Sequence, residues 1–124
     1  MNKLLLITSL LLCSLMVKAQ ESIEGVWVTR KEQSHIQIYQ EGETFQGKVV
    51  KTQDPEDDAL GVKILRGFSK QGDVWVGEIY APHLNTWFDT ELRRIGQVLE
   101  VKVTTGFISR RLAWDLQFIN QKEQ

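Results

Sequence analysis

The chain has 124 residues, of which 25% are charged and 42% hydrophobic, with a formal net charge of −1. This length predicts a single domain. The chain has no block of lysine and arginine, which makes nucleic acid and anionic membrane surfaces poor candidate partners. A single cysteine, Cys13, excludes an internal disulfide framework.

The first residues have the pattern of a secretory leader. Lys3 provides the positive charge, an apolar stretch follows, and Val17-Lys18-Ala19 fits the small-residue rule for cleavage. We therefore expect a signal peptide over residues 1–19, a mature domain over residues 20–124, and a periplasmic or extracellular location. The apolar stretch is shorter than the roughly 20 residues that span a bilayer, so no membrane span is expected in the mature form. A retained anchor and a lipid on Cys13 are the alternatives.

Alternation of apolar and polar residues dominates from residue 25 onward, and no segment keeps a helical period. Polar, glycine-containing turns separate the segments, and a longer polar loop covers Thr52–Leu60. The alternation predicts strands over Gly25–Arg30, Ser34–Gln40, Thr44–Lys51, Val62–Phe68, Val74–Ala81, Thr86–Arg94, Gln97–Thr104 and Leu112–Phe118.

About eight strands joined by short turns favour antiparallel neighbours in a meander. The predicted fold is all-β, a single antiparallel up-and-down barrel, because closure removes exposed edges. An eight-stranded barrel is wide enough to be filled by side chains or to hold one small ligand.

Charged residues assign the faces of the strands, because successive side chains alternate between the interior and the solvent. Glu78 outside, for example, puts Trp75, Gly77 and Ile79 inside. Gly47 and Gly77 are the exceptions in an otherwise bulky predicted interior. They indicate either curvature of the barrel wall or a small cavity.

The residues that carry a family resemblance occur in order along the chain: Gly25-x-Trp27, Ile36-x-Ile38-Tyr39, Gly47, Asp54-Pro55, Gly61-x-x-Ile64-Leu65-x-Gly67-Phe68, Trp75-x-Gly77-x-Ile79-Tyr80-x-Pro82, Leu99-x-Val101 and Trp114. Together they resemble an uncharacterised domain family of exported bacterial proteins with a lipocalin-like barrel. The resemblance implies an eight-stranded barrel, a small hydrophobic or amphipathic ligand, and no established catalytic residues. By the same resemblance, Arg110 or Arg111 would stack on Trp27 and plug one end of the barrel.

Arg66 is the first candidate for contact with a ligand. If Ile64 and Phe68 face inward, alternation carries Arg66 inward with them, where it could bind a carboxylate or phosphate. The alternative is that a bulge at Gly67 turns Arg66 to the solvent.

Aromatic residues on strands two, five and six are candidate walls for an apolar ligand, or simply core. Trp87 and Phe88 are adjacent, so at most one of them faces inward. The complete candidate ligand-binding set is Arg66, Trp75, Gly77, Tyr80, Phe88 and Gly47.

The sequence gives no support for a metal site, a cofactor or a catalytic set. His35 and His83 lack the spacing of metal ligands, and the acidic loop around Asp54 lacks the calcium-loop pattern. We therefore expect a non-enzymatic binding protein that holds a small hydrophobic or amphipathic molecule in its barrel. The alternative is an envelope protein-interaction module with a filled barrel, whose protein partner the sequence does not identify.

Overall fold

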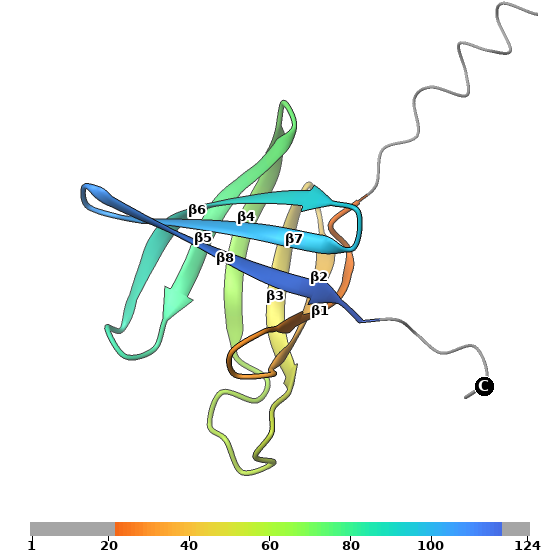
Figure 1. Cartoon of the computed structure of the whole chain (residues 1–124), viewed down its shortest axis with the longest axis vertical. Helices are drawn as coiled ribbons and strands as arrows, with labels where there is room; N and C mark the ends of the chain where they lie inside the picture. Colours follow the sequence, from red (N-terminus) through yellow and green to blue (C-terminus); the bar gives the residue numbers. More distant parts are fainter. Residues whose placement is uncertain (1–21, 118–124) are drawn as a thin grey trace, which may run out of the picture.

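The computed structural model describes residues 22–117 and shows eight antiparallel strands that close into a barrel in chain order (Figure 1). The predicted fold class is therefore confirmed. The expected leader, residues 1–19, lies outside the described residues. Within residues 22–117, no helix has the length and hydrophobicity to cross a membrane. The strands are β1 (Gly25–Thr29), β2 (His35–Glu41), β3 (Thr44–Lys51), β4 (Lys63–Gln71), β5 (Val74–Ala81), β6 (Thr86–Ile95), β7 (Val98–Thr105) and β8 (Ile108–Leu116).

The last strand begins earlier than the alternation predicts. It starts at Ile108 rather than Leu112, so that Arg110 and Arg111 belong to β8 instead of preceding it. β7 and β8 form a hairpin with Thr105 opposite Ile108. The charged pair gave no apolar signal because this part of the hairpin is exposed on both faces.

The seam between the first and last strands is short because β1 itself is short. β1 pairs with β8 only at Trp27–Leu116, Val28–Asp115 and Thr29–Trp114. Among the described strands, the first half of β8 pairs with β7 alone. The barrel wall is therefore complete around one end and interrupted beside β8 at the other.

The two ends of the barrel differ accordingly. We call the end with the β1–β2, β3–β4, β5–β6 and β7–β8 connections the mouth, and the opposite end the closed end (Figure 1). The fully buried core lies near the closed end, where all eight strands are paired. Its members are Ile23, Trp27, Ile36, Ile38, Phe45, Val49, Leu65, Phe68, Leu92, Leu99, Val101 and Trp114.

An ion pair covers the outside of the β1–β8 seam. Arg30 donates two hydrogen bonds to the Asp115 carboxylate, with N–O distances of 2.9 and 3.0 Å. Hydrogen bonding by this guanidinium holds the pKa of Asp115 below its usual value, and the charge of Arg30 acts in the same direction. The seam is thus joined by backbone and side-chain bonds together.

The Arg30–Asp115 pair predicts that the stability of the protein falls at acid pH, and that Arg30→Gln changes this dependence. Because the folded-state pKa of Asp115 is lowered, its contribution to stability is complete above the ordinary value of about 3.9. That contribution is lost as the pH falls through the lowered pKa. In Arg30→Gln the pKa of Asp115 should rise, which a carbon-detected NMR titration of the carboxyl group would measure. The same pKa in both proteins would contradict the assigned role of Arg30.

Candidate functional site

Trp27 seals the closed end of the barrel. Its side chain is fully buried, and its indole Nε1 donates to the carbonyl oxygen of Ile23 at 2.9 Å. Ile23 is also fully buried and precedes β1, so the chain folds across the base of the barrel before the first strand begins. Trp27 therefore occupies the predicted position at one end of the barrel.

The arginine over Trp27 is Arg94, and the expectation of Arg110 or Arg111 is wrong. The Arg94 guanidinium carbon lies 5.3 Å from the Trp27 ring centroid. Its Nη1 donates to the carbonyl of Ser22 at 2.6 Å, and its Nε donates to that of Gly96 at 2.8 Å. Arg110 and Arg111 lie on the exposed half of β8, towards the mouth, and so cannot reach the closed end.

Arg66 does not face the interior, so that prediction is also wrong. Gly67 adopts a φ of +66°, and the β4–β5 register shifts between Arg66 and Ser69. This bulge places both Leu65 and Phe68 in the core and leaves Arg66 outside. The extra residue in the bulge reverses the alternation on which the prediction depended.

On the outer face, Arg66 takes part in a surface cluster. Its Nε donates to Glu78 Oε1 at 2.9 Å, and its guanidinium carbon lies 3.9 Å from the Trp87 ring centroid. Tyr80 packs against Trp87, with ring centroids 5.2 Å apart. Its hydroxyl group donates a hydrogen bond to Asn85 Oδ1 at an O–O distance of 2.6 Å. Tyr80 and Arg66 thus lie together, but on the side of the barrel wall away from the interior.

Gly47 and Gly77 face inward as predicted, but core side chains fill the space beside each glycine. A Cβ on Gly77 would lie 2.6 Å from the Phe68 ring and 2.7 Å from the Arg66 carbonyl oxygen. A Cβ on Gly47 would lie 2.7 Å from Leu65 Cδ1. The glycines allow two large core side chains to cross the interior, so they do not line a cavity.

The remaining two candidate ligand-binding residues, Trp75 and Phe88, lie at different heights in the barrel. Trp75 packs edge-on against Phe45, with ring centroids 4.8 Å apart, and belongs to the margin of the core. Phe88 pairs with Ile79 near the mouth and is half-buried. Of the six candidate residues, the structure thus places Phe88 alone on the inner surface near the mouth, and its contact with a ligand stays a prediction.

The inner surface of the β7–β8 hairpin becomes more exposed towards the mouth. Cross-strand partners share a face, so the pairs Val101–Leu112, Val103–Arg110 and Thr105–Ile108 all lie on the inward side, like Leu99–Trp114 at the closed end. Along β8 the exposed fraction is 4% for Trp114, 47% for Leu112 and 65% for Ile108. β1 covers the first of these positions and ends before the others.

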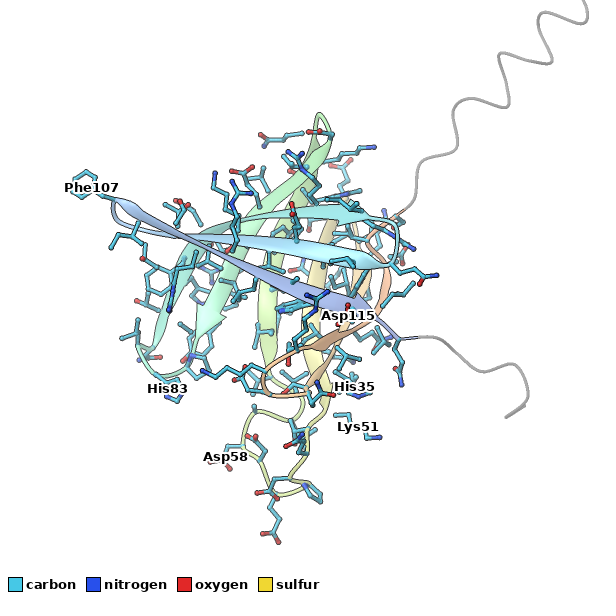
Figure 2. All side chains as sticks on the ribbon, viewed as in Figure 1. His35, Lys51, Asp58, His83, Phe107 and Asp115 are labelled. Atoms are coloured by element: carbon cyan, nitrogen blue, oxygen red, sulfur yellow. The ribbon has the colours of Figure 1, made fainter. Side chains whose placement is uncertain are left out.

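We call the inward-facing residues at this end the mouth face: Ile79, Phe88, Val103, Ile108, Arg110 and Leu112. Sequence reasoning missed its β8 part, because the strand was predicted to start at Leu112. The β3–β4 loop lies at the same end, with Asp58 at its periphery (Figure 2), and its Ala59 and Leu60 pack against the core. Phe107, at the hairpin tip, points away from the barrel (Figure 2).

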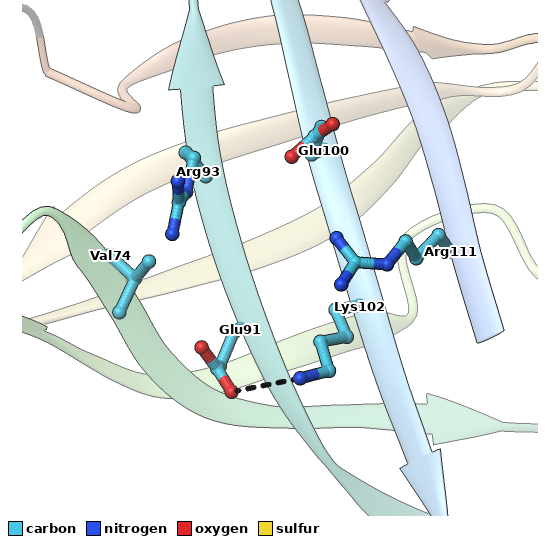
Figure 3. A pocket seen from close by; sticks show the side chains of 6 residues that line it. All are labelled: Val74, Glu91, Arg93, Glu100, Lys102 and Arg111. Atoms are coloured by element: carbon cyan, nitrogen blue, oxygen red, sulfur yellow. Dashed lines mark ion pairs between the residues drawn. The ribbon is translucent and has the colours of Figure 1, made fainter. Parts of the chain in front are cut away.

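A shallow groove on the outer face of β5–β8 has a volume of about 70 Å³ (Figure 3). It is lined by Val74, Glu91, Arg93, Glu100, Lys102 and Arg111. Lys102 and Glu91 form an ion pair at 3.9 Å, so charges of both signs meet in it. Its volume is far below the roughly 300 Å³ of a small-molecule pocket. Within the described part of the chain, no three histidine, cysteine or acidic residues are grouped as metal ligands would be.

Comparison with protein families finds a match over residues 25–115 to a family described as "Uncharacterized protein conserved in bacteria (DUF2147)". The chain belongs to this bacterial family. The match begins with β1 and ends one residue before the end of β8, so it covers nearly the whole barrel and confirms the family resemblance. A search of curated proteins finds no significant match.

Among solved structures, the chain is similar to protein HP1028 from the human pathogen Helicobacter pylori, which is described as belonging to the lipocalin family. The TM-score is 0.66 at 12% identity, and the match covers 84% of this chain and 87% of the other. At this identity the likeness shows a shared fold. This member of the DUF2147 family therefore has a lipocalin-like barrel.

The closed end predicts that Arg94→Ala destabilises the protein. The variant loses a cation–π contact and two hydrogen bonds from a charged donor, a loss of about 1–3 kcal/mol in the free energy of unfolding. Urea unfolding followed by tryptophan fluorescence would measure it. Arg110→Ala is the control and should unfold at the wild-type midpoint. Equal midpoints for all three proteins would contradict the role given to Arg94.

The filled glycine positions predict different costs for two alanine substitutions. Gly77→Ala should lower the free energy of unfolding by about 1–3 kcal/mol, because the new methyl group meets an aromatic ring and a backbone carbonyl. Gly47→Ala should cost somewhat less, because its methyl group would meet only the Leu65 side chain, with Cδ1 at 2.7 Å and Cβ and Cγ at 3.0 Å, and no backbone atom. Chemical denaturation of the two variants tests the order. If Gly77→Ala were neutral, the interior at Phe68 would be looser than described.

Proposed function

We propose that this protein is an exported, non-enzymatic binding protein that holds the apolar part of a small hydrophobic or amphipathic molecule at the mouth of its barrel. Export rests on the leader pattern of residues 1–19. The absence of a recognisable catalytic set in the sequence favours binding over catalysis. The lipocalin-like barrel supports a binding function, because an eight-stranded barrel is wide enough to hold one small ligand.

One observation carries the proposal: on the inner surface of β8, large apolar side chains continue on either side of Arg110, beyond the point where β1 ceases to cover the strand. Leu112 is 47% exposed and Ile108 is 65% exposed, yet both lie on the face that is core at Trp114. Covering such side chains with an apolar ligand would remove them from water, at about 25 cal/mol per Å². The filled closed end limits the ligand to the mouth.

A neutral amphiphile, decanol, tests this function. Titration calorimetry should detect decanol binding to the wild-type protein, and Leu112→Asn should weaken it roughly fivefold or more by introducing an amide into the apolar contact. Val76→Asn is the matched control, because Val76 pairs with Glu91 on the outer face. It should bind decanol as the wild type does. No detectable binding, or equal losses in both variants, would contradict a ligand site at the mouth.

The second candidate is a protein-interaction module in the cell envelope. The filled core and the fully exposed Phe107 at the hairpin tip favour this function. Phe107 adjoins Ile108, which is 65% exposed, and contiguous exposed apolar surface is typical of contact with a partner. The decanol titration separates the candidates, since a module of this kind needs no ligand at its mouth.

A further inference from the structure

Arg110 is the charged residue of the mouth face. Its partner across the hairpin is Val103, and Val103 packs against the core, so the two side chains leave the sheet on the same, inward side. The adjacent Arg111 pairs with Lys102 and lies in the outer groove (Figure 3). Consecutive arginines on one strand thus serve opposite faces of the barrel wall.

Several other arginines of the barrel are bound to partners. Arg30 pairs with Asp115, Arg66 with Glu78, and Arg93 with Asp73. For Arg110, residues 22–117 provide neither an ion pair nor a side-chain hydrogen bond. Its guanidinium is therefore available to an external anion.

The neighbours of Arg110 on this face are apolar. Leu112 and Ile108 are two residues away on either side, and Val103 lies opposite. The strand from Ile108 to Leu112 extends about 13 Å, so an alkyl chain lying along it contacts apolar side chains close to the charge. A ligand there would exclude water from the guanidinium, which strengthens its attraction for an anion.

The rest of the mouth restricts where a negative head can bind. The β3–β4 connection, at this end, contains Asp54, Glu56, Asp57 and Asp58, and carboxylates repel an anion. Figure 2 labels Asp58 among them. On the β8 wall, Arg110 offers the opposite charge with a planar fork of donors suited to a carboxylate.

We propose that Arg110 makes the mouth face a site for an amphipathic acid. The carboxylate accepts hydrogen bonds from the Arg110 guanidinium, and the alkyl chain lies against Val103, Ile108 and Leu112. This inference rests on the proposed binding function and adds the chemical class of the ligand. It moves the anion-binding role from Arg66, on the outer face, to a residue of the inner face.

Three decyl amphiphiles of different charge test the inference: decanoate, decanol and decyltrimethylammonium. The two ions are used below the concentration at which they form micelles, and decanol below its solubility limit. Titration calorimetry should show that wild-type protein binds decanoate about tenfold more tightly than decanol, as expected for one charge-assisted interaction at a half-exposed site. Arg110→Gln should remove this preference while keeping its affinity for decanol. Arg111→Gln is the matched control, with the same chemical change on the opposite face, and should keep the preference.

The outcomes distinguish the inference from the function on which it rests. Decanol binding with no preference for decanoate, or a preference that survives in Arg110→Gln, would overturn the role of Arg110 and leave the mouth as a ligand site. A preference for decyltrimethylammonium would also overturn it and assign recognition to the acidic loop. If none of the three amphiphiles bound, the ligand site and the role of Arg110 would both be wrong. Because Arg110 is exposed, the substitution should not impair folding, and retained decanol binding verifies this.

Discussion

Closure of the barrel depends on the short run of pairing between β1 and the end of β8. Where that pairing exists, eight strands enclose a core of fully buried side chains that Trp27 seals with Arg94. Where β1 ends, the inner surface of β8 continues into the solvent with two exposed apolar side chains, Leu112 and Ile108, on either side of Arg110. The length of one strand therefore determines which part of the inner surface is core and which part is left exposed.

The filled half and the exposed half have complementary roles. At the closed end, Gly47 and Gly77 let Leu65 and Phe68 cross the interior, which gives the dense packing on which stability depends. That packing holds the strands that present the mouth face, so a ligand would meet a surface that is already positioned. Binding to a preformed surface costs little ordering of the protein.

Strand faces could be predicted from the sequence wherever alternation is uninterrupted. Glu78 correctly indicated that Trp75, Gly77 and Ile79 face inward. The same rule puts Arg94 on the inward side of β6, next to Leu92, whereas the family resemblance indicated the later arginines. For Arg66 the rule failed because Gly67 adds one residue to β4. The start of β8 was missed because Ser109, Arg110 and Arg111 are polar and exposed on both faces of the hairpin, and so carry no apolar alternation.

The first half of β8 also has a consequence for solubility. Its edge, beyond the reach of β1, presents backbone N–H and C=O groups to which a strand from another molecule could add. Natural proteins protect such edges with charged side chains, and Arg110 and Arg111 stand on the two faces of this one. The like charges disfavour the approach of a second β8 in register with the first. The two arginines would thus disfavour association of barrels through the part of β8 that β1 leaves unpaired.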